Sequence, residues 1–325
     1  MTTMLRVLAT GLAVIHAAWA QGPGGREPPR GGPWNNDVLV YRVGANGEVT
    51  RMATFERAGV PTIARMKDGR LIAAHQHFPE NNNAEFDKVA VHFSSDDGRN
   101  WTAPQVIRVE NLPQGMRFPF DPTLVPLPDG NLRLYFTGNM ARAHQRGTPA
   151  IHSAISADGV NYTYEPGVRF AVEERMVIDC AVVLHHGLFH LYAPDNGLPA
   201  LPGDSPRGQA GVPAREGVGY HATSKDGLTF SRVADVQIVG RRRWLGNAQS
   251  DGKVITFFGT GEPSGNGFPL AGRPPGGVWM GVSNDGRDFR LVQTPAIPVA
   301  DPGAVALRGG SWIVVGTGPP VRGSR

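Results

Sequence analysis

Three aspartates occupy the same place in a phrase that recurs along this chain. The phrase begins DPT at Asp121, DCA at Asp179 and DPG at Asp301, and an apolar run follows each time. If the copies are equivalent units of one fold, three carboxylates point at one small space. Like charges held close together drive pKa values apart, so one carboxyl stays protonated as an acid while another acts as a base. Hydrolysis of a glycosidic bond needs such a pair.

The same aspartates also have a structural interpretation, because DPT and DPG are turn-like sequences. Each side chain would then bond amides of the loop that enters its strand. Aligning the copies places Val60 and Asn247 at the equivalent positions of the other two. The candidate catalytic residues are Asp121, Asp179 and Asp301, with Glu262 of GTGEP as a reserve acid.

Other side chains are expected at the same mouth, because they precede or follow the strands of the repeated phrase. The predicted substrate-binding residues are His75, His77, Asn139, His190, Asp195, Asn247, Trp244 and Phe120. The two aromatic rings would offer faces on which a sugar stacks, with buried packing as the alternative. The long Pro/Gly-rich segments 196–217 and 263–277 are expected to overhang this mouth.

Histidines raise a further possibility, a divalent metal ion. His75 and His77 are two residues apart, so they share one face if the segment is a strand. With His190 or a carboxylate they would suit zinc or copper. Histidines that bond a sugar or the fold itself are the alternative. No other cofactor is indicated, since the chain has no phosphate-binding loop, no G-x-S-x-G and no H-E-x-x-H.

The elements that must position these residues follow from the repeat. The phrase occurs five times, over 60–78, 121–139, 179–196, 247–262 and 301–319. A second phrase, Ser-x-Asp-Gly-x-x-aromatic, follows four copies, with its serine at Ser95, Ser156, Ser224 and Ser283. Each copy of the first phrase is a strand, a tight turn and another strand. A third strand runs into the second phrase and a fourth leaves it. Four strands repeated at roughly 60 residues form the blade of a β-propeller.

The missing fifth copy of the second phrase predicts how the ring closes. The last repeat stops after two strands, near Pro319, and residues 36–55 contain two strands around a Gly-Ala-Asn-Gly turn. These would complete the fifth blade as its outer strands, which removes exposed sheet edges. We therefore expect an all-β, five-bladed β-propeller over 36–325, with four antiparallel strands per blade, as a monomer.

The turn phrases SSDDGRNW, SADGVNYTY, SKDGLTF and SNDGRDF resemble the Asp boxes of sialidases and related secreted propellers. The five-copy pattern resembles the five-bladed arabinanase, xylosidase and invertase glycosidases. That resemblance implies a base in the first blade, a supporting Asp in the second and a Glu acid in the third. Asp121 matches the second position, Asp179 stands as Asp at the third, and Val60 occupies the first. The sialidase resemblance implies an arginine where AGVPTI has Gly59, and no arginine triad is found.

The N-terminus and the composition limit where the protein works. Residues 1–20 match a secretory signal peptide and 21–35 a disordered Gly/Pro-rich leader. An uncleaved N-terminal anchor is the alternative, and no later stretch is long and apolar enough to span a bilayer. The net charge is +4, but the basic residues are scattered apart from Arg241, Arg242 and Arg243, a run expected to form a solvated loop, so no nucleic acid partner is expected. The single cysteine, Cys180, is expected to be a buried structural thiol.

Taken together, these features predict a secreted or periplasmic enzyme. It would resemble a glycoside hydrolase and act on a carbohydrate, or another small-molecule ligand, through the axial carboxylates. It is sialidase-like by similarity, though without the arginine triad. The alternative is a non-catalytic propeller that binds a glycan or another partner at the same mouth. A metal-dependent site on the histidines is the third possibility.

Overall fold

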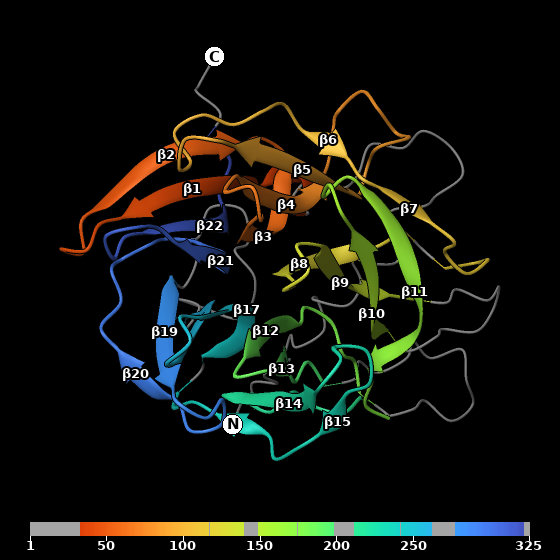
Figure 1. Ribbon diagram of the computed structural model, residues 1–325, viewed down its shortest axis with the longest axis vertical. Helices are drawn as coiled ribbons and strands as arrows, with labels where there is room; N and C mark the ends of the chain where they lie inside the picture. The colour runs from red at the N-terminus through yellow and green to blue at the C-terminus, as the bar shows by residue number, and fades with distance from the viewer. Residues whose placement is uncertain are drawn as a thin grey trace, which may run out of the picture.

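The computed structural model describes residues 33–116, 118–139, 149–173, 175–197, 211–240, 242–261 and 277–321. Within these ranges the chain forms five sheets arranged in a ring, a five-bladed β-propeller (Figure 1). A short 3₁₀ helix, η2 (Pro33–Asn35), precedes the first strand. The expected signal peptide and most of the leader lie outside the described residues. In the part of the chain that is described, no helix is long and apolar enough to cross a membrane.

The blades follow one another along the chain, and each begins with its innermost strand. The first comprises β3 (Ala58–Arg65), β4 (Leu71–His77), β5 (Lys88–Ser94) and β6 (Gln105–Val106). The second comprises β8 (Phe120–Pro126), β9 (Leu132–Gly138), β10 (Ala150–Ser156) and β11 (Asn161–Phe170), with β7 (Arg108–Glu110) added in parallel to β11. The third comprises β12 (Ala181–His185), β13 (Leu188–Pro194), β14 (Val218–Ser224) and β15 (Ser231–Arg232), and β16 (Val236–Gln237) also pairs with β14.

The fourth blade comprises β17 (Arg243–Ser250), β18 (Ile255–Thr260), β19 (Val278–Ser283) and β20 (Arg290–Val292). The fifth is built from both ends of the chain, in the order β21 (Ala300–Ala306), β22 (Trp312–Gly318), β1 (Asp37–Val43) and β2 (Val49–Phe55). β1 pairs with β22 from Asp37 opposite Gly318 to Val43 opposite Trp312. The sheet order therefore agrees with the prediction that the N-terminal strands close the ring as the outermost strands of the last blade.

A buried carboxylate fastens this closure. Asp37 is 1% exposed, and its Oδ1 accepts a hydrogen bond of 2.8 Å from the amide of Arg57, at the entrance to the first blade. Its Oδ2 accepts a 2.7 Å bond from the amide of Val321, beyond the last strand. One side chain thus joins the start of the first blade to the C-terminal end of the fifth.

The turn phrases lie between the third and fourth strands of their blades, as predicted. In the second blade the hydroxyl of Ser156 donates to Asp158 Oδ1 (3.0 Å), and Asp158 accepts the amide of Asn161 (2.8 Å). Hydrogen bonds of this kind hold the turn closed. The first turn differs by one residue from expectation, because Ser94, not Ser95, bonds Asp96 (2.9 Å). Asp97, at φ 54°, is the additional residue.

Five apolar clusters fill the five interfaces between neighbouring blades. The cluster between the second and third blades, for example, joins Tyr135 and Ile151 to Leu191 and Tyr220. Cys180 belongs to this cluster and is buried, as predicted for a structural thiol. Burial raises the pKa of its thiol, which keeps it protonated and unreactive. The blades are therefore held together by face-to-face apolar packing, and polar groups lie near the axis.

Candidate active site

The three aspartates sit at the entrances to inner strands, in an unusual backbone conformation. The φ angles are 51° at Asp121, 58° at Asp179 and 49° at Asp301, and Val60 of the first blade has 49°. Positive φ is uncommon for residues other than glycine, and β-branched valine tolerates it least. At Val60, Asp121 and Asp301 the strand pairing slips by a residue, which is the pattern of a β-bulge. Bulges redirect side chains.

Hydroxyl groups from the preceding blade hold these entrances in place. Thr137 Oγ1 accepts the amide of Asp179 (3.2 Å), and Thr260 Oγ1 accepts the amide of Asp301 (2.9 Å). At the closing seam Thr317 Oγ1 accepts the amide of Val60 (2.9 Å). The same device therefore operates at three blade boundaries, whether or not the residue it holds is an acid.

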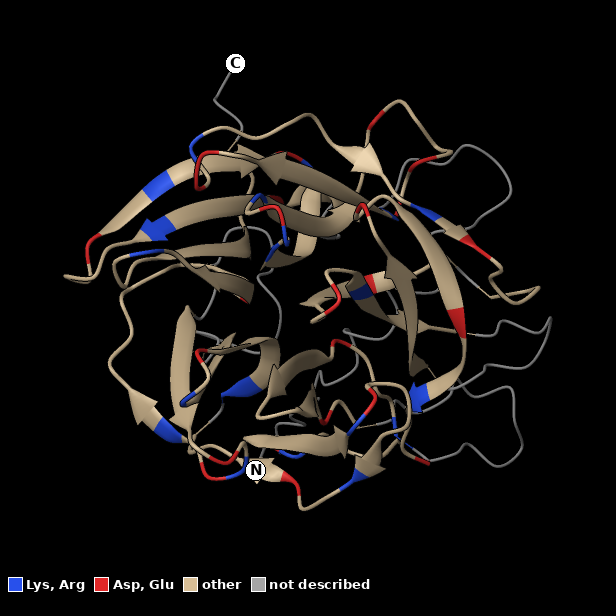
Figure 2. Ribbon diagram, in the orientation of Figure 1, with Lys and Arg blue, Asp and Glu red and all other residues tan. Residues whose placement is uncertain are grey.

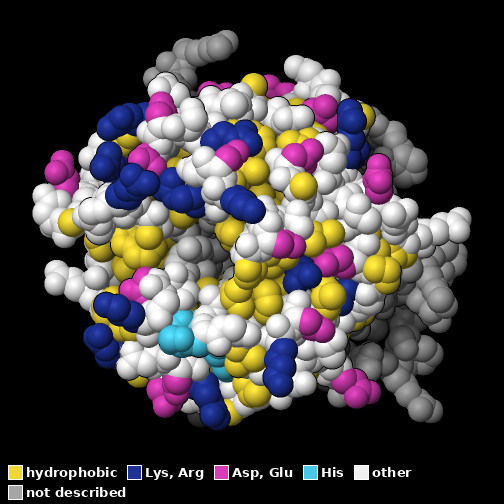
Figure 3. All heavy atoms as spheres, in the orientation of Figure 1, with side chains coloured by type: hydrophobic (Ala, Val, Ile, Leu, Met, Phe, Trp, Pro, Cys, Tyr) yellow, Lys and Arg dark blue, Asp and Glu magenta, His cyan; other side chains and the backbone are white. Residues whose placement is uncertain are grey.

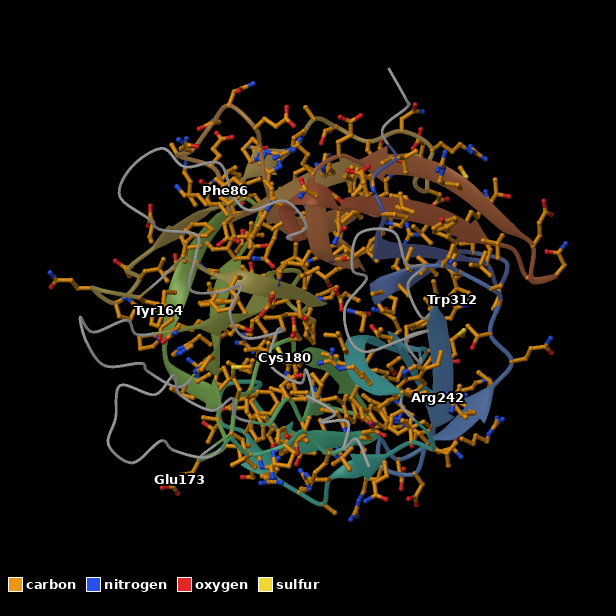
Figure 4. All side chains as sticks on the ribbon, turned by 180° about the vertical axis from the view of Figure 1, so that it is seen from behind. Phe86, Tyr164, Glu173, Cys180, Arg242 and Trp312 are labelled. Carbon is orange, nitrogen blue, oxygen red and sulfur yellow. The ribbon has the colours of Figure 1, made fainter. Side chains whose placement is uncertain are left out.

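The carboxyl groups of Asp121 and Asp179 lie within hydrogen-bonding reach of each other. Two carboxyls can hydrogen-bond only if one is protonated, so the pair shares a proton. Asp179 is held in its neutral form, because burial and then the charge of Asp121 raise its pKa well above the ordinary value. Figure 4 shows Cys180, the next residue in the chain, near the middle of the ring in projection.

Asp301 completes the carboxylate cluster from the fifth blade. Burial, and then the adjacent carboxyl of Asp179, raise its pKa to about 7, while Arg243 and a hydrogen bond from the hydroxyl of Thr317 oppose the rise. Its side chain is buried, and its Oδ1 has no hydrogen-bond partner within the described ranges. Near neutral pH this carboxyl therefore exchanges between its acid and base forms.

Arg243 of the fourth blade is the cation of the cluster, and sequence analysis did not place it there. It opens β17, and its charge lowers the pKa values of both Asp179 and Asp301. Figure 2 shows how the Lys and Arg residues are distributed over the blades. Its guanidinium also donates to the side-chain oxygen of Asn196. The run of three arginines could have indicated a cation at this site. Without the strand register, however, such a run is interpreted as a solvated loop.

The alignment of Asn247 with the aspartates was wrong by two positions. Asn247 pairs with Phe258 inside the β17–β18 ladder, as Thr62 and Thr123 do with their own second strands. Its amide group is buried and bonds Thr62 Oγ1 (3.4 Å) and Gln249 (2.8 Å). The fourth blade has one extra residue at its bulge, which no sequence repeat revealed.

The predicted stacking rings are part of the core. Trp244 is fully buried, its indole nitrogen donates to the carbonyl of Gly217 (3.0 Å), and its ring packs edge-on against Phe257 and Trp279. Phe120 is 6% exposed, which leaves it little face for a sugar. Buried packing, the alternative for both rings, is what the structure shows.

Asp195 has a structural role, because its carboxylate forms ion pairs within the fold rather than facing a substrate. Its buried carboxylate bonds Arg175 (2.8 Å) and Arg215, and it also accepts the amide of Gly197 (2.9 Å). Burial alone would raise its pKa, but these hydrogen bonds lower it overall. Asn139 lies at the end of the second blade's second strand, and its buried Oδ1 has no partner in the described part of the chain. Glu262 lies outside the described residues.

The three candidate metal ligands are not brought together. His190 stacks on His221 and shares a 3.0 Å contact between ring nitrogens, within the third blade. His75 stacks instead on His92, at the seam between the first and fifth blades. The reason is that side chains of second strands point into the interface with a neighbouring blade, not into the axis. Across the described residues no group of three His, Cys, Asp or Glu is placed to hold a metal ion.

Comparison with known proteins places the fold but not the family. No protein-family model matches the chain, and no curated protein matches its sequence. Among solved structures, an α-L-arabinofuranosidase of Clostridium thermocellum superposes with a TM-score of 0.51 at 14% identity, over 80% of this chain and 81% of that one. The glycoside hydrolase family 32 β-fructofuranosidase of Bombyx mori gives 0.54 at 13% identity, over 82% of this chain and 56% of that one.

A glycoside hydrolase family 43 arabinoxylan arabinofuranohydrolase of Bacillus subtilis gives a TM-score of 0.52 at 14% identity, over 79% of this chain and 58% of that one. Identities this low establish a shared architecture. These structural neighbours are β-propeller glycoside hydrolases, and this chain has their propeller.

Proposed function

We propose that the protein is a secreted glycoside hydrolase whose axial aspartates cleave a glycan. One observation carries the proposal: Asp121, Asp179 and Asp301 are gathered at the entrances of three inner strands, where burial raises the pKa of Asp179 well above its ordinary value and that of Asp301 to about 7. Environments that separate the pKa values of neighbouring carboxyls supply an acid and a base in one site. The architecture shared with propeller glycoside hydrolases supports the same assignment.

In this mechanism Asp179 is the general acid. It gives its proton to the glycosidic oxygen as the bond to the anomeric carbon breaks, and the electron pair of that bond leaves with the departing alcohol. Asp301 is the base, and its carboxylate takes a proton from the water that attacks the anomeric carbon. Asp121 keeps the proton of Asp179 in place through their hydrogen bond. Exchange with solvent then restores both groups.

This assignment moves the base by one blade from where the resemblance to five-bladed glycosidases implies it. Val60 has the backbone conformation of the aspartates but no acid. The fifth blade adjoins the first, and Val60 and Asp301 are linked through the hydroxyl of Thr317, which accepts the amide of one and donates to the carboxylate of the other. A single displacement by water inverts the anomeric centre, which proton NMR of the first-formed product detects.

A substrate panel tests the proposal. Arabinosides, xylosides, fructosides, mannosides and sialosides are incubated with wild type, Asp179→Asn and Asp301→Asn, and with Asp251→Asn as a control in an exposed turn of the fourth blade. We expect turnover of at least one substrate, a loss of kcat/KM of about 100-fold or more in the axial variants, and none in the control. Equal activity in wild type and Asp179→Asn would sink the assignment, as would a panel with no turnover. No sialoside activity is expected, since an arginine triad is absent from the sequence pattern.

A second function is favoured by Val60, which leaves the first-blade acid position without a carboxyl. The site would then bind a glycan without cleaving it. Calorimetric titration of the same panel distinguishes the two, because a binding protein gives saturable heats, releases no reducing sugar and keeps its affinity in the Asp→Asn variants.

Export is part of the proposal and rests on residues 1–20 alone. Amino-terminal sequencing of protein recovered from the medium or periplasm of an expressing bacterium should begin at Gln21. Recovery of the intact Met1 form only in the cell interior would overturn it.

A further inference from the structure

A cavity of about 400 Å³ lies between the fifth and first blades. Its walls are the end of β2, the histidines of β4 and β5, and residues 99–102 and 104, which run from the end of the first turn phrase into the segment after it. None of its lining residues belongs to the axial cluster of aspartates. The face of the ring in Figure 3 shows mixed charges around a hollow near the centre, and the cavity is separate from that axis.

Five aromatic rings form one continuous wall of this cavity. Phe55 stacks on His92 with centroids 3.9 Å apart, and Trp101 meets Phe55 edge-on at 5.4 Å. His75 stacks on His92 at 5.1 Å, and His77 follows at 5.9 Å from His75. Ligand sites are commonly apolar and aromatic surfaces with a few placed polar groups.

The hydrogen positions on two of these imidazoles follow from their partners. His75 Nδ1 lies 2.9 Å from the carbonyl of Gln76, and His92 Nδ1 lies 2.6 Å from the carbonyl of Thr102. A carbonyl only accepts, so each Nδ1 carries the hydrogen and each Nε2 is left as an acceptor. His75 Nε2 and His77 Nδ1 are buried and have no partner in the described segments. A ligand hydroxyl both donates and accepts, so it can bond either kind of ring nitrogen.

The charge of the cavity selects against ions. Burial lowers the pKa of His75 to about 3, and it lowers those of His77 and His92 as well, so all three rings are neutral at pH 7. Arg99 and Glu56 add one charge of each sign. Metals bind in the plane of an imidazole, and His75 and His92 are stacked 27° from parallel, so they do not converge on one ion.

We propose that this cavity binds one neutral sugar unit, a pentose or hexose residue. The ring of the sugar would pack on Trp101, the partly exposed ring of the wall, while its hydroxyls bond the imidazoles and accept from Thr54 and Arg99 at the rim. The inference rests on the proposed function, because a glycan-cleaving enzyme gains from a second hold on a long substrate.

The test measures binding, so it does not depend on turnover. Full-length Asp179→Asn protein with labelled histidine rings is titrated with xylose, arabinose, galactose and mannose, and the ring resonances are followed by NMR. We expect saturable shifts at His77 and His92 with at least one sugar. His77→Phe keeps a ring but loses both nitrogens, and should weaken binding about tenfold. Ala53→Leu narrows the cavity from the outer strand and serves as a second variant if His77→Phe fails to fold.

Two outcomes would overturn the inference. One is the absence of ring shifts with all four sugars, or shifts that survive unchanged in both variants. The other is stoichiometric binding of zinc to these rings in place of any sugar. If the protein hydrolyses a glycan but binds no sugar in this cavity, the inference is wrong and the proposed function stands. If it binds a sugar here but hydrolyses no glycan, the proposed function is wrong and the cavity still binds sugar.

Discussion

Replacing Asp301 by asparagine should stabilise the protein at high pH, although it removes the proposed base. The folded state raises the pKa of this carboxyl from 3.8 to about 7, chiefly through burial. Because the folded state holds the proton more tightly than the unfolded chain, the stability that this carboxyl contributes is fully present below pH 3.8. It falls as the pH rises through 7 and is constant above that. Asparagine has nearly the same shape and cannot ionise, so it escapes this loss.

The size of the effect follows from the pKa difference. A change from 3.8 to about 7, at about 1.4 kcal/mol per unit, corresponds to about 4 kcal/mol of lost stability by pH 8. This is an upper limit for the gain in Asp301→Asn, because the variant also removes the carboxylate that faces Arg243. Urea unfolding of wild type and variant at pH 4, 5, 6, 7 and 8 gives the difference directly, and it should grow with pH.

Asp251→Asn is a control for which the stability change should have the opposite sign and the opposite pH dependence. Backbone hydrogen bonds from Val254 and Lys253 lower the pKa of this exposed turn aspartate, so its contribution to stability is present at neutral pH and lost in acid. The control variant should therefore be less stable than wild type at pH 7 and equal to it in acid. A destabilised Asp301→Asn at pH 8, or a difference that does not change between pH 4 and 8, would refute the account of the axial cluster.

Three further predictions concern the cluster and the closure of the ring. For the substrate that the panel identifies, kcat/KM should rise with pH through about 7 as Asp301 ionises, then fall when the pair containing Asp179 loses its proton; a profile flat from pH 5 to 9 would contradict these roles. Arg243→Met removes the charge that lowers the pKa of Asp301, so the rising limb should move to higher pH, and an unchanged limb would exclude that coupling. Asp37→Ala leaves two amides unbonded at the seam and should cost about 1–3 kcal/mol, with faster hydrogen exchange in β1 and β22 by mass spectrometry; wild-type exchange there would show that the carboxylate does not fasten the ring.

The fold could be predicted from the sequence because the repeat records it several times. Five copies of a strand–turn–strand phrase fix the number of blades, and the unequal number of turn phrases fixes how the ends meet. What a repeat cannot fix is a single inserted residue. The turn at Ser94 and the bulge before Asn247 each contain one, and each displaced the predicted position of a side chain.

The candidate site was predictable in part for the same reason. The aspartates lie at the entrances of inner strands, which converge by symmetry, so their meeting follows from the architecture. Histidines on second strands were expected at the same mouth, yet His75 and His190 turn into different interfaces between blades. Their direction depends on strand twist and on which neighbouring face has room, and neither is written in local sequence. Arg243 was missed because its role depends on that register.

Val60 separates the structural from the functional interpretation of the axial aspartates. If a carboxylate were needed to hold the strand entrance, the first blade could not make the same entrance without one. It does so with valine at φ 49°, held by the hydroxyl of Thr317, just as Thr260 holds Asp301. Buried carboxyls with raised pKa values cost stability at neutral pH, and the Thr bonds that hold these entrances do not need them. The buried aspartates lower the stability of the fold, and valine forms the same strand entrance without that cost. We therefore expect the aspartates to serve catalysis rather than folding.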